Sequence, residues 1–330
     1  MSNATLEMAD PFSYTSAAEV EGGAIIGRTF IELAQERDDI VLIAPDIGRG
    51  PATMPFIEAY PDRYIDTGIA ENNSVSIAAG LAADGYRPFV LGIGAFLAPK
   101  CVEQIRTDIA MNRLPVTLIS AWGGLDMGYF GTSHHGLDDI SLLRGIPHLT
   151  VAFAADNTAM GAMMRTGVAD GGPLYIRAPS SAGNDVYSGS PRFERGKANV
   201  LAQGKDVALI GTGLGTALCA QAAAILKDTG VSATVVDMAY LKPFDGDTVC
   251  RLARETGGLV VVEEHNSAAG LASLVAETLG RGGIAARLAA VGLPDDDLAI
   301  AVPRQLLERY GLTAEAIAAK ARALVGRRKS

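Results

Sequence analysis

Short apolar runs recur along the chain and alternate with segments of helical periodicity. In the first half these runs are Ile40–Ala44, Pro88–Ile93, Pro115–Ser120, His148–Phe153 and Pro173–Ala178. Strands that are apolar on both faces need cover on both faces, which is the situation of parallel sheets in α/β proteins. The alternation therefore predicts a doubly wound α/β domain, with helices on both sides of a parallel sheet.

The alternation stops between residues 180 and 205, where glycine, serine and charged residues dominate, and then resumes. Such a stretch is typical of a linker, and 330 residues suit about two domains. We expect a second, smaller doubly wound domain with strands near residues 206–211, 232–238, 258–263 and 285–291. The predicted division is an N-terminal tail at 1–15, a first domain at 16–182, a linker at 183–205 and a second domain at 206–330.

The composition excludes several classes of protein. The formal net charge of -9 argues against a nucleic acid or an anionic membrane as partner. No apolar run approaches the roughly 20 residues of a membrane-spanning helix. The cysteines Cys101, Cys219 and Cys250 are widely spaced and form no metal-binding pattern. Without a recognisable targeting segment they suit a reducing compartment, so we expect a soluble, cytoplasmic protein.

One stretch, Tyr64–Ala83, combines an extended start with an Ala-rich segment of helical character. Its small residues leave little side-chain bulk, so another molecule or segment can approach the backbone closely. Glu71 stands where the helix is expected to begin, with apolar Ile69 and Val75 nearby in sequence. A carboxylate is favourable at a helix N-terminus, so a charge that helps the helix begin is the simplest interpretation of Glu71 from this stretch alone.

Two motifs suggest other chemistries but are incomplete. Gly211–Gly215 reads GTGLG between a strand and a helix, and Asp237 ends the next strand, as in dinucleotide-binding folds. The third glycine of that fingerprint is replaced by Thr216, and tight turns need glycine in any case. His134 and His135 are followed by acidic residues, but adjacent side chains point in different directions and make a poor metal pair. A dehydrogenase or metalloenzyme is therefore not supported.

Taken together, several segments resemble the transketolase family. They are GIAEN at 68–72, PFVLGIGAFLAPKCVEQIR at 88–106, GTSHHGLDDISLLRGIPHLTV at 131–151, LYIRAPS at 174–180 and VVVEEHNSAAGLASLVAE at 260–277. The resemblance extends over about residues 22–324 and is greatest to the small subunit of split, two-component transketolases. It identifies the first predicted domain as the pyrimidine-binding domain and the second as the transketolase C-terminal domain.

The resemblance implies thiamine diphosphate chemistry. In the family a glutamate at the position of Glu71 meets the aminopyrimidine ring of the cofactor, where a carboxyl in an apolar pocket can share a proton with a ring nitrogen. Phe96 corresponds to an aromatic residue stacked on that ring. His134 corresponds to a histidine that contacts substrate oxygens, and Arg177 to an arginine that contacts phosphate. Asp46 and Ile69 are further candidates for lining the cofactor cleft.

An element that thiamine enzymes require is missing from the sequence. The chain contains no Gly-Asp-Gly motif, and Asp245-Gly246-Asp247 has a different order in the wrong place. A hard cation that clamps a diphosphate needs oxygen ligands. We therefore expect Mg²⁺ and the diphosphate to be held by a separate large subunit, within an α2β2 assembly that self-associates through the C-terminal domain. No metal-ligating residue is expected in this chain.

The chain departs from the family pattern around the substrate. Split transketolases usually read GEDGASHQ where residues 128–135 read GYFGTSHH. Phe130 replaces an aspartate that recognises a sugar hydroxyl, His135 replaces a glutamine, and Trp122 stands where the family has a histidine. A pocket that loses hydroxyl-binding groups and gains aromatic rings discriminates less strongly in favour of sugars. We therefore expect transfer of a ketol or acyl unit to a non-standard acceptor.

Two alternatives from other classes remain open at this point. The β subunits of 2-oxoacid dehydrogenases and decarboxylases share the architecture, although the SHH and YIRAPS segments resemble transketolases more closely. A non-catalytic relative that keeps the fold is the third interpretation, because fold alone does not imply function. The joint presence of Glu71, Phe96, His134 and Arg177 favours an enzyme.

Overall fold

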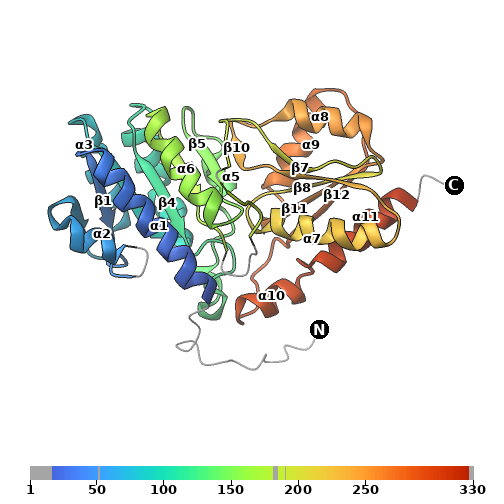
Figure 1. The fold of residues 1–330 in the computed structure, drawn as a ribbon, viewed down its shortest axis with the longest axis horizontal. Coiled ribbons are helices and arrows are strands. Elements are labelled where there is room, and N and C mark those ends of the chain that lie inside the picture. The colour runs from blue at the N-terminus through green and yellow to red at the C-terminus, as the bar shows by residue number, and fades with distance from the viewer. Residues whose placement is uncertain (1–16, 51–52, 181–184, 190, 327–330) are drawn as a thin grey trace.

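The computed structural model describes residues 17–50, 53–180, 185–189 and 191–326. The predicted tail at 1–15 and the start of the predicted linker lie outside these residues. Two α/β units lie side by side, each built on its own sheet (Figure 1). Within the described ranges, no helix has the length and apolar character needed to cross a membrane.

The first unit is built on a seven-stranded sheet of order β10-β5-β6-β4-β3-β1-β2. Its strands are β1 Ile40–Ala44, β2 Tyr64–Asp66, β3 Arg87–Ile93, β4 Thr117–Ala121, β5 Thr150–Phe153, β6 Leu174–Arg177 and β10 Tyr240–Lys242. All neighbouring strands run parallel except β10 and β5. Every residue of β1, β5 and β6 is buried, which confirms the predicted parallel sheet.

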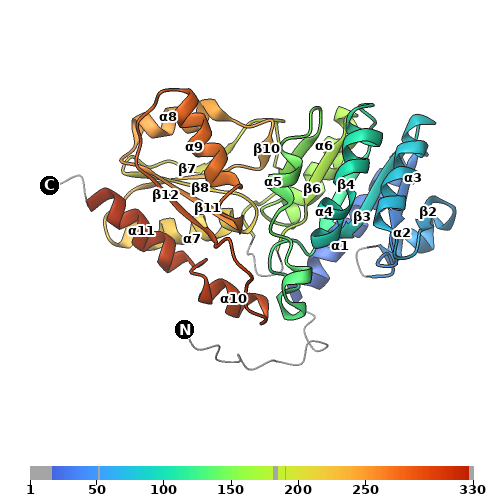
Figure 2. The ribbon, with the colours of Figure 1, turned by 180° about the vertical axis from the view of Figure 1, so that it is seen from behind.

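Helices cover both faces of this sheet. They are α1 Ala17–Glu36, α2 Met54–Ala59, α3 Glu71–Ala83, α4 Gly94–Gln104, α5 Asp139–Leu143 and α6 Asn157–Asp170. In Figure 1, α1 and α6 cross the near face, and Figure 2 shows α3, α4 and α5 on the opposite face. The helix α4 begins at Gly94, directly after β3, and contains Pro99 in its interior. Phe96 therefore lies in the first turn of a helix.

The second unit is built on a five-stranded sheet of order β12-β11-β8-β9-β7, in which only β7 runs antiparallel to its neighbour. Its strands are β7 Asn199–Ala202, β8 Val207–Gly211, β9 Ala233–Asp237, β11 Leu259–Asn266 and β12 Leu288–Leu293. Its helices are α7 Leu214–Asp228, α8 Gly246–Glu255, α9 Leu271–Arg281, α10 Pro303–Arg309 and α11 Ala314–Gly326. In the views of Figures 1 and 2, α8 and α9 lie on one side of the strands and α7 and α11 on the other.

The predicted linker at 183–205 needs correction, because residues 199–202 form β7 at the edge of the second sheet. The alternating burial of this strand explains why no apolar run marks it in the sequence. β10 is also missing from the sequence-based prediction. It follows β9 in the chain but pairs with β5, with Tyr240 opposite Ala152. The second half of the chain thus supplies an edge strand of the first sheet.

The described part of the connecting segment is fixed to both units by hydrogen bonds. Asp156 caps α6 through the amide of Ala159, and its other carboxylate oxygen accepts from the amides of Val186 and Tyr187. The Tyr187 hydroxyl then donates to Asp237 Oδ2 at 2.6 Å, at the end of β9. The segment therefore links the ends of two sheets instead of forming a free tether.

Asp237 should make stability depend on pH. Burial raises its pKa to about 7, against the hydrogen bonds from Tyr187 and Thr216. The folded state therefore keeps a proton that the unfolded chain, with a carboxyl pKa near ~4, has lost. The free energy of unfolding should fall as pH rises between roughly 4 and 7, by at most about 1.4 kcal/mol per pH unit from this group.

Asp237→Asn is expected to remove this contribution, because asparagine resembles the protonated acid. Urea unfolding at several pH values should show a flatter pH dependence for Asp237→Asn than for the wild type. Asp228→Asn, at the exposed end of α7, should keep the wild-type dependence. Parallel curves for the wild type and Asp237→Asn would contradict the prediction.

Candidate active site

Glu71 is a buried carboxylate at the first position of α3. Its residue exposure is 5%, although no side-chain cap precedes it and the helix begins after Ala70. The ammonium of Lys100, on α4, lies 2.5 Å from Glu71 Oε2. Lys100 is itself nearly half exposed, whereas Ile69 points to solvent and is 79% exposed. The partner of the Glu71 carboxylate is thus a cation.

Phe96 connects Glu71 with the histidine loop. The ammonium of Lys100 lies 5.4 Å from the centre of the Phe96 ring, and the His134 ring packs edge-on against Phe96 at 5.1 Å between centroids. Phe96 and Lys100 are four residues apart on one helix, so they share a face. Three predicted site residues and Lys100 therefore lie together. Sequence reasoning missed Lys100, although its spacing from Phe96 could have indicated it.

His134 lies on a loop that is closed by a single bridge between Gly124 and Gly136. Two short 3-10 turns, Gly128–Phe130 and Thr132–His134, form the loop. The rings of Phe130 and His134 lie 4.7 Å apart, and Ser133 Oγ lies 2.9 Å from His134 Nδ1. Phe130 is 49% exposed, so Phe96, His134 and Phe130 form a row of rings that ends at the surface.

The two other substrate candidates near this loop differ in position. Trp122 directly follows β4, has a left-handed backbone (φ 48°) and is partly exposed. His135 is buried, with Nε2 3.4 Å from the carbonyl oxygen of Gly128, and burial lowers its pKa. The ring of His135 packs inside the loop, and its contact with substrate stays a prediction. The different environments of His134 and His135 agree with the expected divergence of adjacent side chains.

Arg177 lies where the two units meet. It is 4% exposed, and its guanidinium donates to the carbonyl oxygens of Glu264 and Gly136 and forms an ion pair with Asp139, Nε to Oδ2, at 3.1 Å. Its carbon Cζ lies 4.5 Å from the centre of the Phe153 ring. The guanidinium is therefore enclosed between the two units, and its contact with a substrate phosphate stays a prediction. The sequence could not reveal this enclosure, since all partners but Phe153 and Asp139 are backbone groups.

Asp46 follows the C-terminal end of β1, and Glu71 follows the neighbouring strand β2. It has a left-handed backbone (φ 61°), and its amide donates to Asp66 Oδ1 at 3.2 Å. The same oxygen accepts from the amide of Gly68 at 3.0 Å. Asp66 thus ties the two turns that precede Glu71. Asp46 and Ile69 are both exposed beside the start of α3, which leaves their predicted role as cofactor contacts a prediction.

Comparison with known proteins identifies these two units. Residues 18–184 match the model of the transketolase pyrimidine-binding domain, and residues 196–317 match that of the transketolase C-terminal domain. The chain belongs to the transketolase family. The second match begins before Lys205, in agreement with the place of β7 in the second sheet.

Relatives of two kinds are similar to this transketolase-family chain. One subunit of the apulose-4-phosphate transketolase of Phocaeicola vulgatus is 34% identical over 88% of this chain and 92% of that protein. A split-gene transketolase, solved as an inactive β4 tetramer, has a TM-score of 0.85 and 35% identity over 92% of this chain and 98% of that one. The 1-deoxy-D-xylulose-5-phosphate synthase of Symbiobacterium thermophilum is 36% identical over 93% of this chain. The chain spans only 47% of that synthase, about half the length of several curated relatives that it matches.

The GTGLG turn of this transketolase-family chain is explained by packing. A Cβ on Gly211 would lie 2.4 Å from the Thr216 amide nitrogen, and one on Gly215 would lie 2.3 Å from the Val262 carbonyl oxygen. Asp237, which would bind a ribose in a dinucleotide fold, is fully buried beneath Thr216 and Tyr187. The glycines permit close contact of the start of α7 with β8 and with β11, and this packing accounts for the glycines of the turn.

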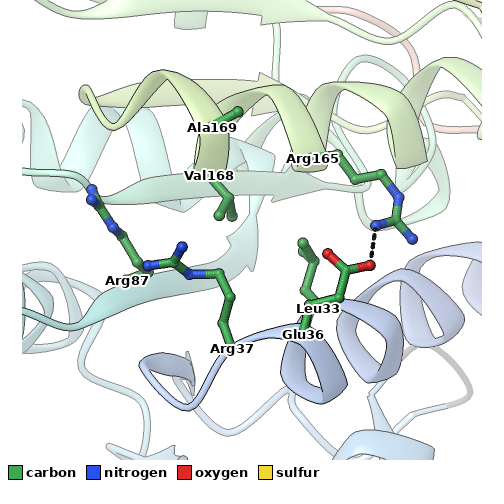
Figure 3. Close-up of a pocket in the computed structure, with 7 residues that line it drawn as sticks. All are labelled: Leu33, Glu36, Arg37, Arg87, Arg165, Val168 and Ala169. Atoms are coloured by element: carbon green, nitrogen blue, oxygen red, sulfur yellow. Dashed lines mark hydrogen bonds and ion pairs between the residues drawn. The ribbon is translucent and has the colours of Figure 1, made fainter.

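A pocket of about 440 Å³ lies away from these residues, between α1 and α6 (Figure 3). It sits at the end of the sheet where β3 begins, whereas Phe96 and Trp122 follow the ends of β3 and β4. Arg165 pairs with Glu32 and Glu36, and Arg37 pairs with Asp39. Acidic side chains thus pair with two of the three arginines that line the pocket. The pocket is separate from the candidate active site.

Proposed function

We propose that this chain is the small subunit of a two-component, thiamine-diphosphate-dependent transferase of the transketolase type. It would move a ketol or acyl unit from a ketose or 2-oxo donor to an aldehyde-type acceptor. The observation that carries the proposal is the grouping of a buried carboxylate, Glu71, with the rings of Phe96 and His134. The Phocaeicola vulgatus relative is named as one subunit of a transketolase, which supports a divided enzyme.

The residues around Glu71 fit the pyrimidine half of the cofactor. Glu71 offers a carboxylate that can hold a proton at a ring nitrogen, and Phe96 offers an aromatic face for stacking. Lys100 covers both, but its long and partly exposed side chain can turn away. When bound, thiamine diphosphate supplies the carbon nucleophile and the electron sink. We propose that His134, which packs edge-on against Phe96, donates a hydrogen bond to a substrate oxygen.

The diphosphate half is proposed to belong to the large subunit. Among the described residues, no cluster of three or more His, Cys, Asp or Glu side chains could hold a metal ion. A Mg²⁺ ion that anchors the diphosphate needs oxygen ligands from protein side chains. We therefore place the cofactor between two different chains, in an α2β2 assembly in which the C-terminal domains of the small subunits associate. The β4 tetramer of the split-gene relative is reported as inactive, which is consistent with a missing subunit.

Calorimetric titration tests the proposed function. Thiamine diphosphate with Mg²⁺ is titrated into the purified chain, then into its mixture with the proposed large subunit. We expect heat of binding only in the mixture, because no cluster of metal-ligating side chains occurs among the described residues of this chain and the metal anchors the diphosphate. Tight stoichiometric binding by the chain alone would refute the divided site. A mixture that forms a complex but binds no cofactor would refute the function itself.

Phe130 and Trp122, which differ from the family pattern, affect which acceptor the site would bind. Phe130 is half exposed at the end of the ring row, and Trp122 is partly exposed at the start of the loop. These rings replace a carboxylate and a histidine of the family pattern, so we propose an acceptor with fewer hydroxyl groups than a sugar phosphate. If xylulose 5-phosphate and ribose 5-phosphate are the best substrate pair by kcat/KM, this specificity is wrong.

Phe130→Asp should shift preference toward sugars. A carboxylate at this position can accept hydrogen bonds from acceptor hydroxyls, and each such bond contributes about a factor of ten. The ratio of kcat/KM for ribose 5-phosphate over an unsubstituted aliphatic aldehyde should rise by about tenfold or more. Phe130→Leu keeps an apolar side chain and should leave the ratio near the wild-type value. Equal ratios in the two variants would remove Phe130 from the acceptor site.

A further inference from the structure

Residues of the second unit hold the loop that carries His134 and Phe130. We propose that Glu264, on β11, is a positioning residue for this loop: through its side chain and its backbone it ties together the two ends of the loop at Gly124 and Gly136. The inference rests on the proposed function, since it assigns a role to the loop in substrate binding. Leu125 and Glu264 are far apart in the sequence, and no sequence pattern indicates that they are in contact.

The first tie is made by the side chain. Glu264 Oε1 accepts a hydrogen bond of 2.9 Å from the amide of Leu125, and Glu264 is 5% exposed. Its carboxyl group fills the space where the neighbouring residue would carry a side chain, because a Cβ on Gly124 would lie 2.3 Å from Glu264 Cδ. Gly124 also has φ +64°, a conformation that favours glycine. The start of the loop is therefore shaped to receive this carboxyl group.

The second tie runs through Arg177. Its guanidinium donates to the carbonyl oxygen of Glu264 at 2.8 Å and to the carbonyl oxygen of Gly136. Gly136 is the other partner of the Gly124–Gly136 bridge. A further bond joins the amide of Asn266 to the carbonyl oxygen of Leu137 at 3.2 Å. Both ends of the loop are thus fixed to neighbouring positions of one strand.

The middle of the loop also packs on the second unit. A Cβ on Gly128 would lie 2.3 Å from Leu306 Cδ1, and one on Gly131 would lie 3.0 Å from Ile300. The hydrogen bonds at the two ends of the loop therefore position a segment that also packs against α10. The free side of the loop is the one with the exposed ring of Phe130 and the partly exposed ring of His134.

Neighbouring groups affect the protonation of Glu264. Burial and the nearby Asp126 raise the pKa of Glu264, and Arg177 opposes the shift. In either protonation state the carboxyl group offers an oxygen to the Leu125 amide. Glutamine offers the same oxygen, so Glu264→Gln should preserve the tie. Methionine has a similar length but no oxygen, so Glu264→Met removes the tie while filling most of the space.

The test combines two readouts. In the chain alone, amide hydrogen exchange of residues 124–136 should be about ten times faster in Glu264→Met than in wild type, since one buried hydrogen bond is lost. In the complex with the large subunit, Glu264→Met should raise the KM for the aldehyde acceptor by about tenfold, and Glu264→Gln should match wild type. The Kd of thiamine diphosphate should change less than about twofold, because Glu71 and Phe96 lie outside the loop.

Distinct results would overturn the inference. Unchanged exchange in Glu264→Met would show that the side chain does not hold the loop, whatever the activity. Faster exchange with an unchanged KM would show that the tie is only structural. If Glu264→Met does not fold, Glu264→Gln decides alone, since faster loop exchange in that folded variant would contradict the acceptor role of the oxygen. A wild-type complex without transferase activity would instead refute the proposed function, and the exchange readout would still stand.

Discussion

Glu71→Gln is expected to lower kcat of the two-component enzyme by about 10²- to 10⁴-fold, the usual contribution of a positioned acid or base. Glutamine has the same shape as glutamate but cannot exchange a proton with a cofactor nitrogen. The side chain is buried at the start of α3 beside Lys100. A water molecule therefore cannot readily reach this position and take over the proton transfer. Steady-state turnover of the purified complex, with saturating thiamine diphosphate and Mg²⁺, measures the loss.

The matched control is Glu103→Gln, which removes an exposed carboxylate from α4 without touching the ring row. It should keep wild-type turnover. Size-exclusion chromatography with light scattering should show the same assembly for both variants, since neither substitution changes volume. Wild-type turnover in Glu71→Gln would contradict the catalytic role of Glu71. Loss of assembly in that variant would show a structural role instead.

Arg177→Met is expected to destabilise the chain by about 3–5 kcal/mol, the typical cost of removing one partner of a buried ion pair. Asp139 would keep its hydrogen bond from the Tyr175 hydroxyl but would lose the guanidinium that faces it at 3.1 Å. The carbonyl oxygens of Gly136 and Glu264 would lose donors in the same place. Urea unfolding of the chain at about pH 7 measures the loss as a lower free energy of unfolding.

Arg165→Met provides the comparison, because Arg165 also pairs with two carboxylates but is 40% exposed. Exposed ion pairs contribute about 0–1 kcal/mol, so this variant should remain near wild-type stability. Equal losses of unfolding free energy in the two variants would show that burial of the ion pair does not cause the destabilisation. An Arg177→Met chain with wild-type stability and a raised KM only for phosphorylated substrates would support the phosphate contact expected from the family resemblance.

The fold could be predicted because its main signals are local. Strands such as β1 and β8 are buried along their whole length, so the sequence shows them as uninterrupted apolar runs. β7 and β10 carry no such signal: β7 is alternately buried, and β10 is only three residues long. Their positions depend on pairing with β9 and β5, which are distant in sequence or in the other unit. Edge strands of this kind are decided by tertiary contacts.

The candidate site could be predicted only in part. Resemblance indicated Glu71, Phe96 and His134, and the structure joins them in a row: Lys100 contacts Glu71 and Phe96, and Phe96 contacts His134. The same resemblance indicated Arg177 and His135, which the structure buries. A family motif preserves the type of residue at a position, but the exposure of its side chain depends on which backbone groups surround it.

The sequence by itself therefore determined the α/β class, the order of most strands and helices, and the family to which the chain belongs. Each of these depends on apolar periodicity or on motifs a few residues long. The tertiary structure decided the partner of Glu71, the burial of Arg177 and the contact between Glu264 and Leu125. The physical reason is that hydrogen bonds and ion pairs between distant segments involve backbone amides and carbonyls, which nearly every residue carries and no sequence pattern marks.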